Sequence, residues 1–195
     1  MYNKLYLFIG LFILLVSLIS CSKSEDSSTS SSSTSIFKAV GYSGTILSSP
    51  DGITWTSSTW DSQNYGTSKN LSGITYGGST FVAVGWYSTI ISSTDGITWT
   101  EQISGTSNNL ENVIFANGSF LAVGYSGTIL TSPDGITWTA RSSGTLKNLI
   151  GVAYGNSIYV AVGYSGTILT SPDGITWTER DSGKSNYLSG VTFSR

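Results

Sequence analysis

The chain has 195 residues, of which 9 are basic and 11 are acidic, so its formal net charge at pH 7 is −2. Lysine and arginine are too few to form a basic stripe, which argues against a nucleic-acid partner. Histidine, the commonest general base and metal ligand, does not occur, and the single cysteine excludes a disulfide within the chain. We therefore expect a protein that is not an enzyme and that holds neither a metal nor a cofactor.

Residues 1–20 have the features of a targeting segment. Lys4 gives a weakly basic start, and an apolar run of fifteen residues follows at 5–19. A run of this length is too short to span a bilayer. It ends in Leu-Ile-Ser-Cys at 18–21, which resembles the lipobox of bacterial lipoproteins. The resemblance implies cleavage before Cys21 and attachment of fatty acids such as palmitate to it. The alternative is an ordinary secretory signal in which this cysteine occurs by chance.

The Ser-rich segment at 21–35 is expected to be a flexible tether, because it contains too few apolar side chains to bury. Acyl chains on Cys21 would insert into the lipid bilayer, and two or three of them give stable anchoring. Ser22 stands where an aspartate is linked to inner-membrane retention in enteric bacteria. We therefore expect a lipid-anchored protein of the bacterial cell envelope, in the outer membrane or at the cell surface.

An internal repeat occupies residues 36–195. The hexapeptide Asp-Gly-Ile-Thr-Trp-Thr occurs four times, and successive copies are 44, 39 and 39 residues apart. The additional residues of the first unit fall between 57 and 70, where we expect a surface loop, because loops tolerate insertions. The four copies of the hexapeptide lie at 51–56, 95–100, 134–139 and 173–178.

One repeat unit is predicted to contain four short strands. They lie at 149–155, 159–163, 166–171 and 175–179, and all are rich in Val, Ile, Thr and aromatic residues. Asn156 and Ser157 between the first two suit a hairpin turn. A four-stranded unit of about 40 residues at a steady spacing is typical of a β-propeller blade. The predicted fold is therefore all-β, a small β-propeller with four blades of four antiparallel strands.

The two ends of the repeat region complete one blade. Residues 188–194 match the first strand of a unit, whereas residues 36–56 match the other three strands. Pairing of these N- and C-terminal strands would close the ring and leave no exposed sheet edge. Two chains that exchange strands would instead give a dimer of eight blades. The monomer is the default interpretation, because about 160 residues can bury one core.

The repeated Ser-Pro-Asp-Gly-Ile-Thr-Trp sequence resembles the Asp-box, although its aspartate and tryptophan are one residue closer together than in that pattern. The likeness extends to propeller repeats of bacteria, including those of the photosystem II assembly-factor family. It implies that each Asp accepts backbone N–H groups within its own turn and that each Trp packs between sheets. The alternative, metal binding or acid catalysis by these aspartates, is disfavoured because none has a second carboxylate nearby in sequence. The residues concerned are Asp51, Trp55, Asp95, Trp99, Asp134, Trp138, Asp173 and Trp177.

Sialidases also carry Asp-boxes, so a sialidase-like glycoside hydrolase is an alternative function. That family's chemistry needs an arginine cluster, a tyrosine nucleophile with a glutamate partner, and an acid/base aspartate. This chain has only Arg141, Arg180 and Arg195, and the first two occupy the same place in successive repeats. Catalytic residues are therefore not expected.

Binding is expected at the face where the loops between strands 2 and 3 of each unit meet the loops between units. Aromatic rings there can stack on sugars or anchor a peptide. The alternative is that the repeated tyrosines only pack the rim of each blade. We therefore expect a binding or scaffold module for a protein or glycan, or an assembly factor for an envelope protein complex. The candidate ligand-binding residues are Trp60, Trp86, Tyr87, Tyr125 and Tyr164.

Overall fold

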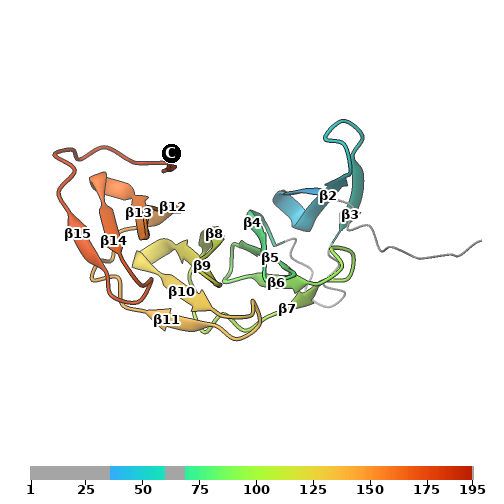
Figure 1. Cartoon of the computed structure of the whole chain (residues 1–195), viewed down its shortest axis with the longest axis horizontal. Helices are drawn as coiled ribbons and strands as arrows, with labels where there is room; N and C mark the ends of the chain where they lie inside the picture. Colours follow the sequence, from blue (N-terminus) through green and yellow to red (C-terminus); the bar gives the residue numbers. More distant parts are fainter. Residues whose placement is uncertain (1–35, 60–68, 195) are drawn as a thin grey trace, which may run out of the picture. The chain divides into compact units, whose positions relative to one another are not determined.

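The computed structural model describes residues 36–59 and 69–194, which belong to one compact unit. This part of the chain consists of fifteen β-strands and three short 3₁₀ turns. The strands form four antiparallel sheets, and each sheet is built from strands that follow one another along the chain (Figure 1). The predicted all-β fold with one sheet for each repeat unit is confirmed.

Three of the sheets have four strands, and the first sheet has three strands among the described residues. The first sheet contains β1 (Phe37–Val40), β2 (Thr45–Ser49) and β3 (Thr56–Thr59). The second contains β4 (Leu71–Gly77), β5 (Thr80–Gly85), β6 (Ile90–Ser93) and β7 (Thr100–Glu101). The third contains β8 (Leu110–Ala116), β9 (Ser119–Gly124), β10 (Ile129–Ser132) and β11 (Thr139–Arg141). The fourth contains β12 (Leu149–Gly155), β13 (Ile158–Gly163), β14 (Ile168–Ser171) and β15 (Thr178–Arg180). The 3₁₀ turns are η1 (Tyr42–Gly44), η2 (Tyr125–Gly127) and η3 (Tyr164–Gly166).

In the fourth sheet the turn chemistry agrees with the sequence prediction between β12 and β13 and differs from it between β14 and β15. Asn156 and Ser157 have φ values of 50° and 60°, so they form the expected two-residue turn between β12 and β13. The fourth strand of that unit was predicted to begin at Ile175, but β15 begins at Thr178. The intervening residues stay in the turn because the side chain of Asp173 accepts the backbone N–H groups of Ile175 and Thr176.

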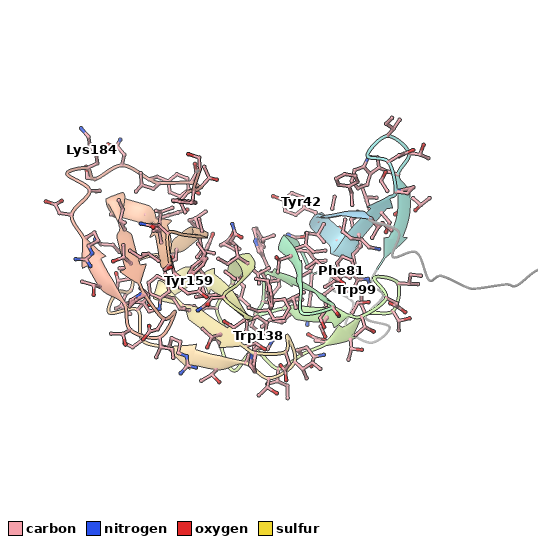
Figure 2. The ribbon with its side chains drawn as sticks, in the orientation of Figure 1. Tyr42, Phe81, Trp99, Trp138, Tyr159 and Lys184 are labelled. Atoms are coloured by element: carbon pink, nitrogen blue, oxygen red, sulfur yellow. The ribbon has the colours of Figure 1, made fainter. Side chains whose placement is uncertain are left out.

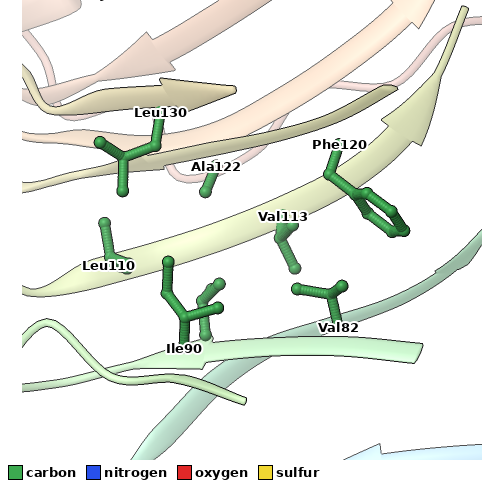
Figure 3. Close-up of a cluster of buried hydrophobic side chains, with 8 residues drawn as sticks. Val82, Ile90, Leu110, Val113, Phe120, Ala122 and Leu130 are labelled. Atoms are coloured by element: carbon green, nitrogen blue, oxygen red, sulfur yellow. The ribbon is translucent and has the colours of Figure 1, made fainter. Parts of the chain in front are cut away.

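The hydrophobic core lies between successive sheets. One cluster joins Val82 and Ile90 of the second sheet to Leu110, Val113 and Phe120 of the third, and these side chains are fully or almost fully buried (Figure 3). Two further clusters of the same kind lie between the first and second sheets and between the third and fourth. Strands such as β5, β6 and β9 are buried on both faces, and this burial is the main source of stability, because each apolar side chain removed from water contributes about 1.5–3 kcal/mol.

A β-bulge interrupts the first strand pair of each four-stranded sheet. In the third sheet, Leu110 pairs with Gly124 and Asn112 pairs with Val123, so Glu111 is the additional residue. The same shift in the second and fourth sheets leaves Ser72 and Ile150 as the additional residues. A bulge bends its strand and redirects the side chain of the additional residue. All three bulges occur at the start of the first strand of the unit.

The innermost contacts between sheets depend on glycine. A Cβ atom on Gly77 would lie 2.0 Å from Cγ of Phe115, and one on Gly155 would lie 2.1 Å from Cγ of Phe193. Phe193 therefore contacts β12 in the way that Phe115 of β8 contacts β4. In addition, the backbone N–H of Leu188 donates to the carbonyl oxygen of Gly163 at 3.0 Å.

Ring closure is not seen in the part of the chain that the structure describes. Residues 188–194 form no strand there, and β1 pairs only with β2. Pairing of the N- and C-terminal strands therefore stays a prediction. Among the same residues, no helix is long and apolar enough to cross a bilayer.

Candidate functional site

Each Asp-box turn is held together by hydrogen bonds between its own residues. Oδ1 of Asp134 accepts the backbone N–H groups of Ile136 and Thr137, both at 2.8 Å, and the hydroxyl of Ser132 at 3.0 Å. The backbone N–H of Gly135 donates to the same serine at 2.8 Å. Equivalent bonds surround Asp51, Asp95 and Asp173.

These hydrogen bonds lower the pKa of all four aspartates. For Asp173 the backbone N–H groups of Thr176 and Ile175 are the main cause, followed by the hydroxyl of Ser171, and the pKa falls to about 2. The carboxylates are therefore ionised at neutral pH, and each one already accepts hydrogen bonds from backbone N–H groups of its own turn. Across the described residues there is no group of three acidic, histidine or cysteine side chains that could hold a metal ion.

The tryptophans of the Asp-box turns fall into two classes. Trp99, Trp138 and Trp177 are partly buried against the core clusters, whereas Trp55 is 41% exposed. Nε1 of Trp138 donates to the carbonyl oxygen of Gly135 at 3.3 Å, which fixes the ring over its own turn. The ring of Trp99 lies 6.3 Å from that of Phe81 of the same sheet, measured between centroids. Both residues are labelled in Figure 2.

The Asp-box turns also contact the preceding sheet. Nζ of Lys38 on β1 donates to the carbonyl oxygen of Gly96, and a Cβ atom on Gly135 would meet Val82 of β5 at 2.7 Å. Because these contacts repeat from unit to unit, the turns act as part of the scaffold. The isoleucine of each turn projects into solvent; its exposed fraction is 50% or more in Ile53, Ile97, Ile136 and Ile175.

A second set of turns lies where the second and third strands of each unit meet, and we call this region the corner face. It comprises η1, η2, η3 and the equivalent residues Trp86–Ser88, together with the loops that join one sheet to the next. Asn109, at the end of such a loop, connects two units. Its Oδ1 accepts the backbone N–H of Tyr87 and its carbonyl oxygen accepts that of Tyr125, both at 2.9 Å. Asn70 and Asn148 make the same pair of bonds.

The predicted aromatic residues occupy different environments on the corner face. Tyr87 is 66% exposed, whereas Trp86 is half-buried and meets the ring of Tyr42 edge-on at a centroid distance of 6.3 Å. Tyr164 is 43% exposed, and Tyr125 is half-buried. Trp60 lies outside the described residues. Tyr87, and not its neighbour, is therefore the more accessible side chain at this corner.

The backbone at Tyr87 departs from the repeat. The three other corners place Ser and Gly in the left-handed region, as at Ser126 and Gly127 with φ of 53° and 70°. In the second unit Tyr87 and Ser88 occupy these positions with φ of 53° and 59°. A bulky residue in this region is an outlier, and such strain is concentrated at functional sites.

Two equivalent grooves open between a corner and the loop that follows its sheet. The first has a volume of about 480 Å³, and its lining includes Ser126, Arg141 and Leu146. The second, one unit further along the chain, has a volume of about 460 Å³ and a more charged lining that includes Lys147, Arg180 and Lys184. In the second groove, Lys147 Nζ lies 3.5 Å from Oε1 of Glu179, which partly neutralises the positive charge.

Two residues of the corner face were not among the predicted site residues. Glu111 is the bulge residue of β8, and its Oε1 is buried without a hydrogen-bond partner among the described residues. Tyr187 ends the loop after the fourth sheet, where the other loops end in asparagine. Both break the repeat, and this break is the signal in the sequence that could have identified them.

Comparisons with known proteins agree with this architecture. Residues 49–188 match the family described as the DUF6242 beta propeller domain. The structure is similar to one described as YCF48 bound to D1 peptide, with a TM-score of 0.63, 22% sequence identity and coverage of 80% of this chain and 53% of the other. It is also similar to YCF48 from Cyanidioschyzon merolae, with a TM-score of 0.61, 22% identity and coverage of 80% and 55%. The chain therefore spans about half the length of these two structures. No curated protein sequence matches it.

Proposed function

The chain belongs to the DUF6242 β-propeller family, and we propose that it is a binding or scaffold module that recognises a protein partner through its corner face. Tyr87 carries this proposal. Its side chain is 66% exposed, and its backbone is held in a left-handed conformation that serine and glycine adopt at the other corners. The scaffold gives no reason for a tyrosine at this position. Exposed tyrosine is among the side chains that dominate binding energy at protein interfaces.

A protein is favoured over a glycan because aliphatic side chains accompany the aromatic ones. Ile103 and Leu146 lie in two of the loops between sheets and are 89% and 87% exposed. Exposed aliphatic groups suit the apolar side chains of a peptide better than the hydroxyl groups of a sugar. The similar YCF48 structure described as bound to D1 peptide shows that a related fold can hold a peptide. Support for the assembly of an envelope protein complex is one role for such a module.

We further propose that the module is tethered to the bacterial envelope by acyl chains on Cys21. This rests on the lipobox-like sequence at 18–21 and on the apolar run before it. A tethered module would search for partners close to the membrane surface, where the tether raises the effective concentration of anything held on the same surface.

The proposal is tested by capturing partners from envelope extracts with three versions of the protein. We expect the parent and Ile136→Ser to retain the same proteins, and Tyr87→Ser to bind them about tenfold more weakly. Ile136 is the matched control because it is an exposed apolar residue of an Asp-box turn. Equal capture by Tyr87→Ser, or loss of capture by Ile136→Ser, would contradict the corner face as the site. A glycan array probed with the same three proteins would identify a sugar ligand instead.

A further inference from the structure

The β-bulge of the third sheet places an acid at the corner face. Glu111 is the additional residue between two aligned pairs, Leu110 with Gly124 and Asn112 with Val123. The equivalent residues of the second and fourth sheets are Ser72 and Ile150. The same bulge therefore forms around a small polar residue and around an aliphatic one, so the fold does not require a carboxylate there.

One carboxylate oxygen of Glu111 has no hydrogen-bond partner within the described part of the chain. Its Oε1 is buried, and no donor among the described residues forms a hydrogen bond with it. Burial raises the pKa of this side chain, because the charged form loses contact with water. A buried acceptor without a donor destabilises the fold, and a bound cation or donor would remove that cost.

The backbone brings Tyr125 close to this acid, because Leu110 pairs with Gly124 and the carbonyl oxygen of Asn109 accepts the backbone N–H of Tyr125 at 2.9 Å. The pKa of Tyr125 is raised mainly by burial, and then by the charges of Glu111, Tyr164 and Tyr187. The rings of Tyr164 and Tyr187 meet edge-on, with centroids 4.8 Å apart and planes at 85°. Tyr125 therefore lies within electrostatic range of Glu111, Tyr164 and Tyr187, although these side chains come from two sheets and the loop after the last strand.

Tyr187 is also a departure from the scaffold. The loops after the first three sheets end in Asn70, Asn109 and Asn148, and each asparagine side chain accepts a backbone N–H from the preceding corner. A tyrosine cannot supply that amide oxygen. Its ring packs on Tyr164 instead, and it is 52% exposed. At this position the amide oxygen that joins two units is therefore replaced by an aromatic ring that packs on Tyr164.

We propose that Glu111, Tyr125, Tyr164 and Tyr187 form a site for one lysine or arginine side chain of the protein partner. The faces of tyrosine rings attract cations, and the carboxylate would supply the opposite charge and a hydrogen-bond acceptor. This inference rests on the proposed function, because it assigns the chemistry of a contact made at the corner face.

The direct test uses two small probes of nearly equal shape. Nα-acetyl-arginine amide carries a charge, whereas Nα-acetyl-citrulline amide does not. The full chain, solubilised in a neutral detergent and labelled with ¹³C-tyrosine, is titrated with each probe. We expect saturable NMR shifts of the Tyr125, Tyr164 and Tyr187 rings with the arginine probe and at least tenfold weaker binding of the citrulline probe. Equal binding of the two probes, or no shift of these rings, would overturn the proposal.

Substitutions test whether binding of the arginine probe depends on the charge of Glu111 or only on an intact fold. Glu111→Gln should weaken binding of the arginine probe at least tenfold, and Tyr187→Asn, which restores the residue of the other loops, should also weaken it. Glu111→Ser and Glu111→Ile place the residues of the equivalent bulges and keep the test valid should Glu111→Gln not fold. Glu101→Gln, which removes an acid from β7 of the second sheet, is the control and should bind like the parent. Parent-like binding by the folded Glu111 variants would disprove this site.

The same variants distinguish this inference from the proposed function. If partner capture is lost with Tyr87→Ser but is unchanged with Glu111→Gln, the corner face remains the binding site and the cation site is wrong. If neither substitution changes capture, both proposals are wrong. Loss of capture with both substitutions supports the two together.

Discussion

The indole ring of Trp138 lies 6.4 Å from the ring of Phe120, measured between centroids, and the two planes meet at 50°. The pair recurs in the second sheet as Trp99 with Phe81 and in the fourth as Trp177 with Tyr159, at 6.3 and 6.5 Å. Each pair joins the Asp-box turn to the second strand of its own sheet. Tyr159 also donates its hydroxyl to the carbonyl oxygen of Ala116 in the preceding sheet, at 2.9 Å. The turn is thereby connected to the core between sheets.

Removal of this ring should destabilise the fold. We expect Trp138→Ala to lower the free energy of unfolding by about 3 kcal/mol, because a large partly buried aromatic side chain is lost together with its packing on Phe120. Trp55→Ala is the matched control, because Trp55 makes the same turn but is 41% exposed. Urea unfolding followed by circular dichroism measures both. Equal losses in the two variants would show that burial of the ring is not the cause.

Substitutions at Tyr87 and Ser88, the two left-handed residues of the second corner, should affect stability and partner binding differently. Ser88→Gly relieves a left-handed non-glycine residue, and we expect it to raise the free energy of unfolding by about 1 kcal/mol. Tyr87→Ser should not destabilise the fold but should lose partner binding. Ser126→Gly makes the same kind of backbone change at a corner that follows the repeat, so it should stabilise the fold without an effect on binding. Thermal melts and binding assays of all three variants, compared with the parent, test this. A destabilised Tyr87→Ser would indicate a structural role for the tyrosine.

The Asp-box turns should make the fold sensitive to acid. The pKa of Asp173 is about 2 in the fold, against about 3.9 in an unfolded chain. Because the folded value is the lower one, the stabilising contribution is fully present above about pH 4 and is lost as the pH falls through about 2. Asp51, Asp95 and Asp134 shift in the same direction.

We therefore expect the melting temperature to fall between about pH 4 and pH 2 at constant ionic strength. In Asp173→Asn the amide oxygen can still accept the two backbone N–H groups but does not titrate in this range, so the fall should be smaller. Melting curves recorded by circular dichroism at several pH values compare the two proteins. The prediction fails if both lose stability equally over this interval.

Lipid attachment depends on one residue. Because Cys21 is the only cysteine, Cys21→Ala should leave an unlipidated precursor or a soluble protein. Metabolic labelling of expressing cells with a fatty acid, followed by gel analysis, measures the attachment. Cys21→Ser is a second variant that keeps a small polar side chain. Label that persists on either variant would contradict the lipoprotein hypothesis.

The repeated parts of the fold could be predicted from the sequence, because the same local signals occur several times. The Asn156-Ser157 turn and the succession of short β-branched strands specified the hairpins. The start of β15 was misplaced because the pattern of Ile175 and Trp177 resembles a strand, whereas the Asp173 carboxylate holds the backbone in a turn. That competition between a side chain and the strand ladder is not visible in residue alternation.

The candidate site was less predictable, because it depends on residues that meet only in the fold. The exposure of Tyr87 against the partial burial of Trp86 follows from one residue's place in the turn. Glu111 is a site candidate only because a bulge redirects it and because no donor among residues 36–59 and 69–194 reaches its Oε1. Neither fact can be read from composition or spacing. A comparison of each unit with its neighbours would nevertheless have marked Glu111 and Tyr187 as departures from the repeat.

The double role of Asn109 has a consequence for how such a chain can change in evolution. Its side chain binds the corner of one unit and its backbone binds the corner of the next, and Asn70 and Asn148 do the same. The contacts that join neighbours are thus contained within the repeated sequence itself. A duplication or loss of one 39-residue unit would create no junction that the protein does not already have. New binding surfaces could then arise by substitution at single corners, as at Tyr87, while the copies on either side preserve the fold.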